Sequence, residues 1–97
     1  MNAGLQAKTA LVTGGTSGIG LAIATALAAE GVQVAVASRD VKTDLAKTLS
    51  DSSGCEALSL RADVSREEDV IRMVDDTVGA FGRLDLFVNN AAQARHQ

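Results

Sequence analysis

Short apolar runs that suit β-strands alternate along this chain with longer segments that suit α-helices. The strand-like runs are rich in Val, Leu and Ala, and the longer segments carry apolar residues at every third or fourth position. Parallel strands need crossovers of that length, so the alternation predicts an α/β fold with a parallel sheet and helices on both faces. The predicted strands span residues 9–13, 32–38, 56–61 and 84–89, and the predicted helices span residues 18–30, 41–50 and 65–78.

Residues that favour helix ends support these boundaries. Gly31 is expected to end the first helix, because glycine readily adopts the left-handed conformation found there. Asp40 is a candidate N-cap of the second helix, and the Asp-Ser-Ser-Gly cluster at 51–54 is expected to break it. Ser65, with Glu68 three residues later, has the form of a capping box that opens the third helix. The turn into the fourth strand is assigned to Gly79, Gly82 and Arg83.

Apolar spacing also indicates one face on each helix. Large apolar side chains recur every four residues in the first and second helices, and the third has a stripe that fits a buried side. These residues are Ile19, Ile23 and Leu27 in the first helix, Val41, Leu45 and Leu49 in the second, and Val70, Met73, Val74 and Thr77 in the third.

The composition narrows the classes of function. The 97 residues suffice for one domain, and a net charge of −3 with scattered basic residues argues against nucleic-acid binding. There is no Tyr or Trp, which excludes a tyrosine acid and leaves no stacking platform for bases. Cys55 and His96 are the only residues of their kinds, so neither an internal disulfide nor a metal site is expected. No secretory leader or membrane-length apolar stretch is visible, so a cytoplasmic location without membrane contact is the default expectation.

The glycine-rich turn at residues 13–20 is the most informative segment. It lies between the first predicted strand and the first predicted helix, where unpaired backbone N–H groups and the helix dipole attract an anion such as a pyrophosphate. Thr16 and Ser17 can add hydroxyl hydrogen bonds. A P-loop would need Lys and then Ser or Thr after its last glycine, but Gly20 is followed by Leu21, so triphosphate chemistry is disfavoured. A tight turn without any ligand is the alternative.

The turn has the form TGxxxGxG, and in this position it resembles the short-chain dehydrogenase/reductase superfamily. Three later segments agree with the resemblance: Ala62-Asp63-Val64, Phe81-Gly82-Arg83-Leu84-Asp85 and Asn89-Asn90-Ala91-Ala92. It covers roughly residues 5–92 and implies a Rossmann-like three-layer α-β-α fold that binds a nicotinamide dinucleotide. The implied cofactor-binding residues are Gly14, Gly15, Thr16, Ser17, Gly18, Ile19, Gly20, Ser38, Arg39, Asp63, Val64, Asn90 and Ala91.

The end of the second predicted strand bears on the choice between NADP and NAD. A carboxylate there accepts hydrogen bonds from the adenosine ribose, whereas a cation pairs with the additional phosphate of NADP. By analogy with the family, Ser38 stands where an NAD-preferring member would usually carry Asp, and Arg39 follows it. The expected cofactor is therefore NADP in preference to NAD. Two observations weigh against this: Asp40 is a nearby acidic candidate, and Ser17 stands where many NADP-preferring relatives place a second basic residue.

The resemblance assigns Asp63 and Val64 to the adenine and Asn90 and Ala91 to the cofactor ribose. The alternative for Asp63 is that it caps the loop ahead of Ser65. Ala92 replaces the glycine of the family pattern, which puts a close approach of the backbone to the cofactor in doubt.

The catalytic residues of the family are not found in this sequence. The resemblance implies hydride transfer to or from a carbonyl or alcohol, with a Tyr that donates the proton, a Lys four residues after it, a Ser that orients the substrate oxygen and an Asn that completes a proton relay. The chain has no Tyr, and its lysines, Lys8, Lys42 and Lys47, all precede the fourth predicted strand. His96 lies in a patternless tail and Cys55 is expected to be a small half-buried side chain, so no turnover is expected from this chain alone.

We expect residues 1–92 to form a dinucleotide-binding half-domain and residues 93–97 an unpatterned tail, as the front half of a truncated oxidoreductase. In the doubly wound order 3-2-1-4-5-6, its strands would lie in the order 3-2-1-4 beside three helices. Residues 84–88 would then form a free apolar edge that invites self-association. Two other hypotheses stay open: a module that binds or senses the dinucleotide without turnover, and a fragment without function.

Overall fold

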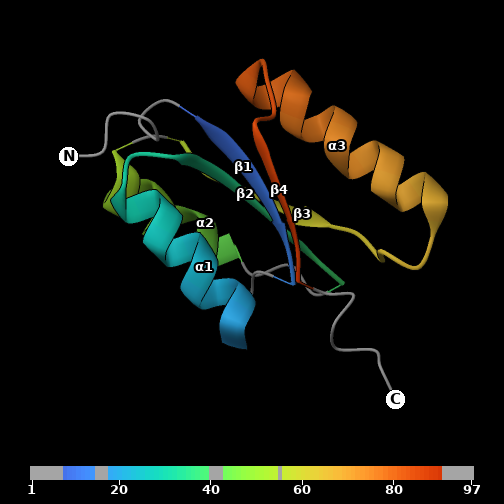
Figure 1. Ribbon diagram of the computed structural model, residues 1–97, viewed down its shortest axis with the longest axis horizontal. Coiled ribbons are helices and arrows are strands. Elements are labelled where there is room, and N and C mark those ends of the chain that lie inside the picture. The colour runs from blue at the N-terminus through green and yellow to red at the C-terminus, as the bar shows by residue number, and fades with distance from the viewer. Residues whose placement is uncertain (1–7, 15–17, 40–42, 55, 91–97) are drawn as a thin grey trace.

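The computed structural model describes residues 8–14, 18–39, 43–54 and 56–90. Within them, a four-stranded parallel sheet has the order β3-β2-β1-β4, which confirms the predicted order. Helices α1 and α2 cover one face of this sheet and α3 covers the other (Figure 1). The elements are β1 (Thr9–Thr13), α1 (Gly18–Ala29), β2 (Gln33–Ser38), α2 (Thr43–Ser53), β3 (Leu58–Arg61), α3 (Glu67–Phe81) and β4 (Leu86–Asn89).

The two central strands, β1 and β2, supply most of the core. Every residue of β1 is buried, and β2 is buried over its four middle residues, as expected for strands covered on both faces. Alternate side chains divide between two clusters. Ala10, Val12, Val34, Val36 and Leu49 belong to the cluster under α1 and α2. Leu11, Ala35, Ala37, Ala62 and Met73 belong to the cluster under α3.

Helix α1 packs on the sheet through its small residues. The buried positions are Gly20, Ala24 and Ala28, whereas Ile19 is 68% exposed and Ile23 and Leu27 are half-buried at the margin of the core. The four-residue period predicted from the large side chains is therefore present, but the buried stripe lies one residue further along. Alanine and glycine allow the helix axis to approach the sheet closely, and this contact excludes the larger side chains.

The ends of α1 and α2 differ in how well the sequence predicts them. Gly31 follows α1 with a φ of 85°, which confirms its left-handed role. Residues 51–54 were expected to break α2, but the helix continues through Ser53, so this prediction was wrong for residues 51–53. Gly54, with a φ of 74°, ends the helix by donating its N–H to the carbonyl of Ser50 at 2.9 Å. The proposed cap Asp40, the residue Val41 and the side chain of Leu45 lie outside the described residues.

Helix α3 starts and ends later than predicted. Its N-cap residue is Arg66, whose side chain makes no capping hydrogen bond, so the capping box predicted from Ser65 and Glu68 was wrong. The Ser65 hydroxyl donates to Asp63 instead (2.7 Å), and Glu68 pairs with Arg66 (2.6 Å). The predicted buried side is confirmed, because Met73 and Thr77 are buried and Val70 and Val74 pack at the core margin.

The C-terminus of α3 lies at Gly82, whose φ of 87° and N–H bond to the Val78 carbonyl close the last turn. Gly79 lies inside the helix rather than in the turn predicted from it. Strand β4 begins at Leu86, two residues after its predicted start, because Asp85 is used to fix the loop: its carboxylate accepts the Thr9 N–H at 2.9 Å.

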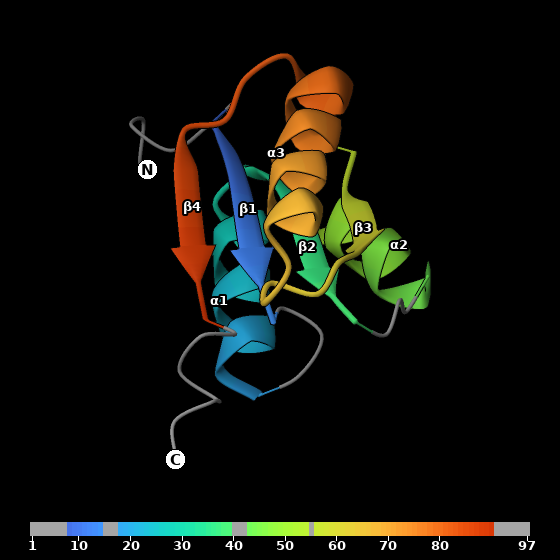
Figure 2. The same cartoon turned by 90° about the vertical axis from the view of Figure 1, so that its right-hand side faces the viewer.

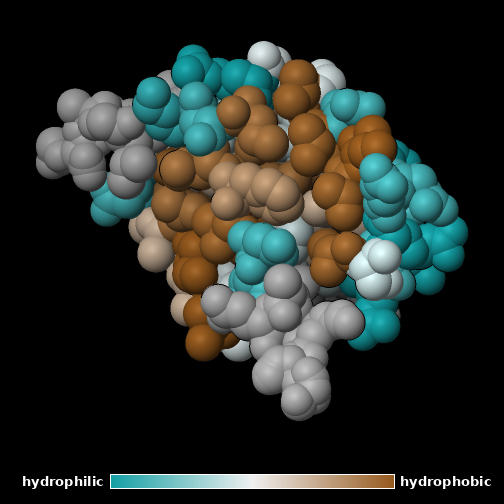
Figure 3. Space-filling view, turned by 45° about the vertical axis from the view of Figure 1, so that its right-hand side comes forward, coloured by the Kyte–Doolittle hydropathy of each residue, from teal (hydrophilic) through white to brown (hydrophobic). Residues whose placement is uncertain are grey.

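In the described part of the chain β4 pairs with β1 alone, so its other side is a free sheet edge, visible at one margin of the sheet in Figure 2. Leu86 and Phe87 of this strand are 37% and 46% exposed. Apolar side chains gather over the face that carries β4 (Figure 3). None of the described helices is long and apolar enough to cross a membrane.

Candidate functional site

The carboxyl ends of the four parallel strands lie together at one end of the sheet, the carboxyl edge, and α1 begins there (Figure 2). In open α/β sheets, ligands bind in the crevice outside this edge, where neighbouring strand connections turn to opposite faces. The connections through α1 and α2 run over one face of the sheet and lead from β1 to β2 and β3, whereas the connection through α3 runs over the other face and leads to β4 on the opposite side of β1. The division between the two directions therefore falls between β1 and β4. The candidate residues follow the strands at this edge.

Two glycines of the turn after β1 are required by their backbone conformation, and a third is required by space. Gly14 and Gly18 have φ values of 67° and 59°, in the left-handed region that favours glycine. A Cβ at Gly20 would lie 2.1 Å from the Gly14 carbonyl oxygen and 2.8 Å from Asn90 Nδ2. The turn, the start of α1 and the end of β4 are therefore in close contact at Gly20.

The start of α1 is suited to an anion. The helix has no acidic residue in its first turn, and its first two residues, Gly18 and Ile19, are exposed. Its unpaired N–H groups and the positive end of its dipole attract negative charge, as in other phosphate sites at helix N-termini. Gly15, Thr16 and Ser17, which the sequence also assigned to this turn, lie outside the described residues.

A hydrogen bond that the sequence prediction missed links β1 to β4. Thr13 is buried, and its Oγ1 lies 3.0 Å from Asn89 Oδ1 and 3.3 Å from the carbonyl oxygen of Val88. This contact holds the end of β4, and with it Asn90, against the glycine turn. A hydroxyl residue at the buried end of an apolar strand was the available signal, because such a group must find a partner.

Ser38 and Arg39 lie where β2 ends. Ser38 is half-buried and its carbonyl accepts the Ala62 N–H at 2.9 Å, which ties β2 to the segment after β3. Arg39 is exposed and forms no ion pair with the described carboxylates. Its guanidinium is near enough to Asp63 to contribute to that residue's electrostatics.

Asp63 caps the loop ahead of Ser65, which was the alternative to an adenine contact. Its Oδ1 accepts the Ser65 hydroxyl at 2.7 Å and the Ser65 N–H at 3.0 Å. The Ser65 hydroxyl and then the Ser65 N–H hold the pKa of Asp63 below its ordinary value, with smaller help from the charges of Arg39 and Arg66. Among the described residues, these bonds use Oδ1 of Asp63. Val64 beside it packs at the margin of the α3 cluster.

The structure brings Gly14, Gly20 and Asn90 into direct contact and places Ser38, Arg39 and Asp63 along the same edge. Ala91 and Ala92 lie outside the described residues, as do Cys55 and His96. Within the described ranges, no group of three His, Cys, Asp or Glu residues could hold a metal ion. The groups that this edge presents are the backbone N–H groups at the start of α1 and the exposed guanidinium of Arg39, both of which suit an anion.

Known proteins with this arrangement are numerous. The family model described as short chain dehydrogenase matches residues 8–97. A tropinone reductase-like protein from Erythroxylum coca is 44% identical over 87 residues, which are 90% of this chain and 31% of the relative. The chain thus spans about a third of the length of the curated relatives it matches.

Solved structures agree with the sequence match. L-sorbose reductase from Gluconobacter frateurii, complexed with NADPH and L-sorbose, superposes with a TM-score of 0.85 at 37% identity, over 93% of this chain and 35% of the reductase. An NADH-dependent reductase, A1-R′, complexed with NAD, gives a TM-score of 0.83 at 30% identity, over 92% of this chain and 38% of the other. With its parallel sheet, its glycine turn and this match over nearly all its residues, the chain belongs to the short-chain dehydrogenase family.

Proposed function

We propose that this chain is the dinucleotide-binding part of an NAD(P)-dependent oxidoreductase that transfers a hydride between the nicotinamide and a carbonyl or alcohol carbon. The observation that carries the proposal is the contact at Gly20, where a Cβ would meet the Gly14 carbonyl at 2.1 Å. Such close packing brings the helix start and the strand ends together and leaves backbone N–H groups to bind the diphosphate.

The proposed cofactor contacts are distributed along the carboxyl edge. The glycine turn and the start of α1 would bind the diphosphate, the end of β2 the adenosine ribose, the segment after β3 the adenine, and the segment after β4 the second ribose. The residues are Gly14, Gly15, Thr16, Ser17, Gly18, Ile19 and Gly20, then Ser38 and Arg39, then Asp63 and Val64, and finally Asn90 and Ala91.

We propose NADP as the preferred cofactor. Ser38 offers no carboxylate that would repel a 2′-phosphate, and the exposed Arg39 next to it has no carboxylate partner among the described residues. A guanidinium can donate two parallel hydrogen bonds to a phosphate, an interaction that a ribose hydroxyl cannot replace.

Residues 1–92 would provide binding, and the chemistry would need groups that these 97 residues do not contain. The sequence holds no tyrosine, and its three lysines, Lys8, Lys42 and Lys47, precede β4. We therefore propose that the 97 residues bind the cofactor without turning it over. The same absence of tyrosine favours, as a second candidate, a module that senses the dinucleotide. A cytoplasmic location is proposed with either function, since one cysteine cannot form an internal disulfide.

The free edge of β4 is the proposed surface for self-association. On this side β4 pairs with no other strand of the described residues, and Leu86 and Phe87 beside it are 37% and 46% exposed. A second copy can pair with this edge and cover these side chains, whereas an uncovered apolar edge strand promotes aggregation.

The binding proposal is tested by titrating the chain with NADPH and NADH and following nucleotide fluorescence. The Gly20→Ala variant is expected to bind NADPH at least about tenfold more weakly, because the new methyl group must displace the Gly14 carbonyl. Gly79→Ala is the matched control: its Cβ meets nothing within 4 Å, inside helix α3. Equal NADPH affinity for all three proteins, with circular dichroism spectra that show them folded, would contradict the proposal.

A further inference from the structure

We propose that Arg61, at the end of β3, is a second cation for the 2′-phosphate of NADP and acts together with Arg39. The inference rests on the proposed NADP preference and adds a specificity residue that the cofactor residues assigned above do not include. Two observations support it: which arginines of the described residues form ion pairs, and the register in which β3 pairs with β2.

The arginines of the described residues fall into two groups. Three of them have a carboxylate partner, and these pairs are Arg66 with Glu68 at 2.6 Å, Arg72 with Asp69 at 3.0 Å and Arg83 with Asp85 at 2.8 Å. Arg39 and Arg61 have no such partner among the described residues. The two guanidinium groups without an ion pair therefore both lie at the carboxyl edge of the sheet, where the nucleotide is expected.

The register of the sheet brings Arg61 next to the position that discriminates between the cofactors. In the parallel pairing of β2 with β3, Arg61 is the partner of Ser38. Neighbouring strands lie about 4.8 Å apart, so the Arg61 backbone lies one strand spacing from Ser38. The carbonyl of Arg61 also accepts a hydrogen bond from Arg72 Nη2 at 2.9 Å, which fixes its backbone while the side chain is exposed.

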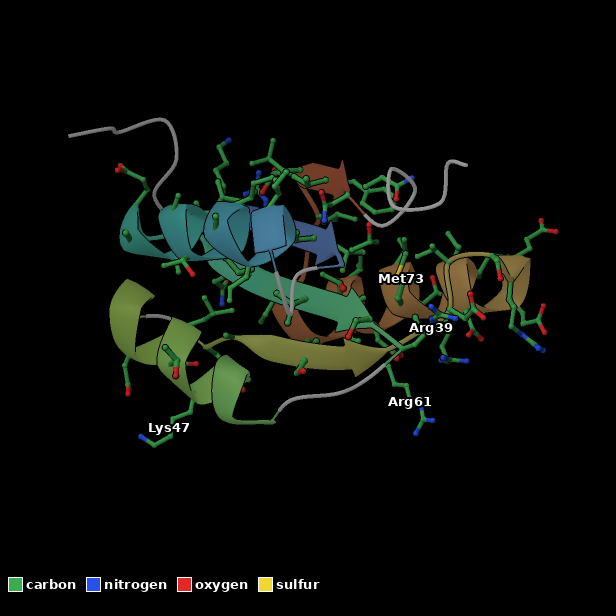
Figure 4. All side chains as sticks on the ribbon, turned by 90° about the horizontal axis from the view of Figure 1, so that it is seen from below. Arg39, Lys47, Arg61 and Met73 are labelled. Carbon is green, nitrogen blue, oxygen red and sulfur yellow. The ribbon has the colours of Figure 1, made fainter. Side chains whose placement is uncertain are left out.

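Strand alternation places the two cations on different faces of the sheet. Ala35 and Ala37 pack in the α3 cluster, so Arg39 continues their side of β2, and Ser38 continues the side of Val34 and Val36 under α1 and α2. Leu58 and Leu60 pack in the α3 cluster, so Arg61 shares the face of Ser38. Figure 4 shows Arg39 and Arg61 extending from neighbouring strand ends, Arg39 toward α3 and Arg61 outward past β3.

A phosphate on the ribose above Ser38 would thus have one arginine on each side. An exposed arginine changes rotamer within nanoseconds, so Arg61 can turn from its outward position to an arriving dianion. A ribose hydroxyl in the same place carries no charge and gains little from either group. The ligand class that this pair selects is therefore a ribose 2′-phosphate, and Arg61 supplies the second positive charge that Ser17 does not.

The test measures dissociation constants for NADPH and NADH with the wild-type chain, Arg61→Gln, Arg39→Gln and the double variant. We expect Arg61→Gln to weaken NADPH binding about five- to tenfold, a moderate effect because the site is exposed and screened by salt, and to leave NADH binding within about twofold. Lys47→Gln is the matched control: it removes the same charge from α2, where Lys47 pairs with Asp51 and lies away from the strand ends (Figure 4). The double variant should bind the two cofactors equally well.

A competition between adenosine 2′,5′-bisphosphate and 5′-AMP isolates the phosphate itself, and Arg61→Gln should reduce the advantage of the bisphosphate by the same factor. An NADPH preference that Arg61→Gln leaves unchanged would overturn the role of Arg61 alone. A wild-type chain that binds NADH as tightly as NADPH would overturn both this role and the proposed cofactor preference. Arg61→Lys, which keeps the charge but loses the bidentate geometry, should bind NADPH with intermediate affinity.

Discussion

At the scale of single residues, contacts within the protein fix the positions of the groups that form the candidate site. The Gly14 carbonyl leaves no space for a side chain at Gly20, and two hydrogen bonds from Ser65 orient the Asp63 carboxylate. Preorganised groups of this kind lose little conformational freedom on binding, which favours affinity. The same bonds connect the site to the pH dependence of folding.

The pKa of Asp63 is held below its ordinary value of 3.8 by the Ser65 hydroxyl and N–H, so folding favours its ionised form. Its contribution to the free energy of unfolding is therefore complete above the ordinary pKa and is lost as the pH falls through the lower native pKa. The Asp63→Asn variant should be less stable than wild type at neutral pH. In urea unfolding experiments the difference should stay constant from about pH 7 to about pH 5 and should shrink as the pH falls below the ordinary value of 3.8. A difference that stayed constant below that value as well would show that the charge plays no part.

At the scale of elements, strand β1 is bound to β4 by side-chain hydrogen bonds at both of its ends. Its last residue, Thr13, reaches Asn89 at 3.0 Å and the Val88 carbonyl at 3.3 Å, and its first residue, Thr9, donates its N–H to Asp85 at 2.9 Å. Both ends of the β1–β4 pair are thus bound by side chains in addition to the ladder. A four-residue edge strand needs such support, because short edges fray.

Thr13→Val keeps the side-chain volume and removes the hydroxyl. We expect the free energy of unfolding to fall by about 1 kcal/mol, the net value of one hydrogen bond whose partners are partly buried. Amide hydrogen exchange should accelerate more in β4 than in β2. Equal acceleration in both strands would mean that Thr13 stabilises the sheet as a whole and does not hold β4 in particular.

Helix α3 begins without a side-chain cap at Arg66, so an acidic residue at that position should stabilise it. Arg66→Asp is expected to raise the free energy of unfolding by about 0.5–1 kcal/mol relative to Arg66→Ala, which loses the same exposed ion pair without adding a cap. Thermal unfolding of the two variants provides the comparison. Indistinguishable melting temperatures would contradict the capping argument.

The accuracy of sequence-based prediction differed between elements for physical reasons. The strand order was predicted from the doubly wound arrangement that the family resemblance implies. The buried side of α3 was predicted from its apolar spacing, and Met73 and Thr77 are buried as expected. The buried stripe of α1 could not be located from hydrophobicity, because alanine and glycine pack closest there and exclude Ile19. The capping box failed because the Asp63 carboxylate competes for Ser65, and this competition depends on the loop geometry after β3.

The same limit applies to the candidate site. The glycine pattern predicted the turn that Gly14, Gly18 and Gly20 form, because positive φ and close approach leave a direct mark on the sequence. The link from Thr13 to Asn89 joins residues 76 positions apart, and the register of Arg61 with Ser38 depends on strand pairing. Contacts of that range are set by tertiary structure, and no local pattern encodes them.

At the scale of the whole molecule, the described residues form a three-layer unit whose sheet ends at β3 on one side and at β4 on the other. The face under α1 and α2 and the face under α3 are both packed, whereas β4 leaves Leu86 and Phe87 partly exposed along the free edge. Edge strands of natural proteins usually carry charges or are covered, and Leu86–Asn89 contains no charged residue.

Phe87→Glu is expected to reduce self-association, because a charge on the free edge opposes pairing with a second copy. The molar mass measured by light scattering should rise with concentration for wild type and stay at that of one chain for the variant. Ile71→Glu is the control, since Ile71 is 55% exposed on α3 and lies outside β4. Equal loss of association in both variants would indicate general apolar adhesion and contradict a role for the β4 edge.

We propose above all that the N–H groups at the start of α1 bind the diphosphate of a nicotinamide dinucleotide. The most direct measurement is a titration of the isotope-labelled chain with NADPH, followed by two-dimensional NMR of the backbone amides. We predict that the largest chemical-shift changes occur at Gly14, Gly18, Ile19 and Gly20, which line the glycine turn. Saturating NADPH that leaves these amides unchanged, or that shifts only residues far from the carboxyl edge, would contradict the claim.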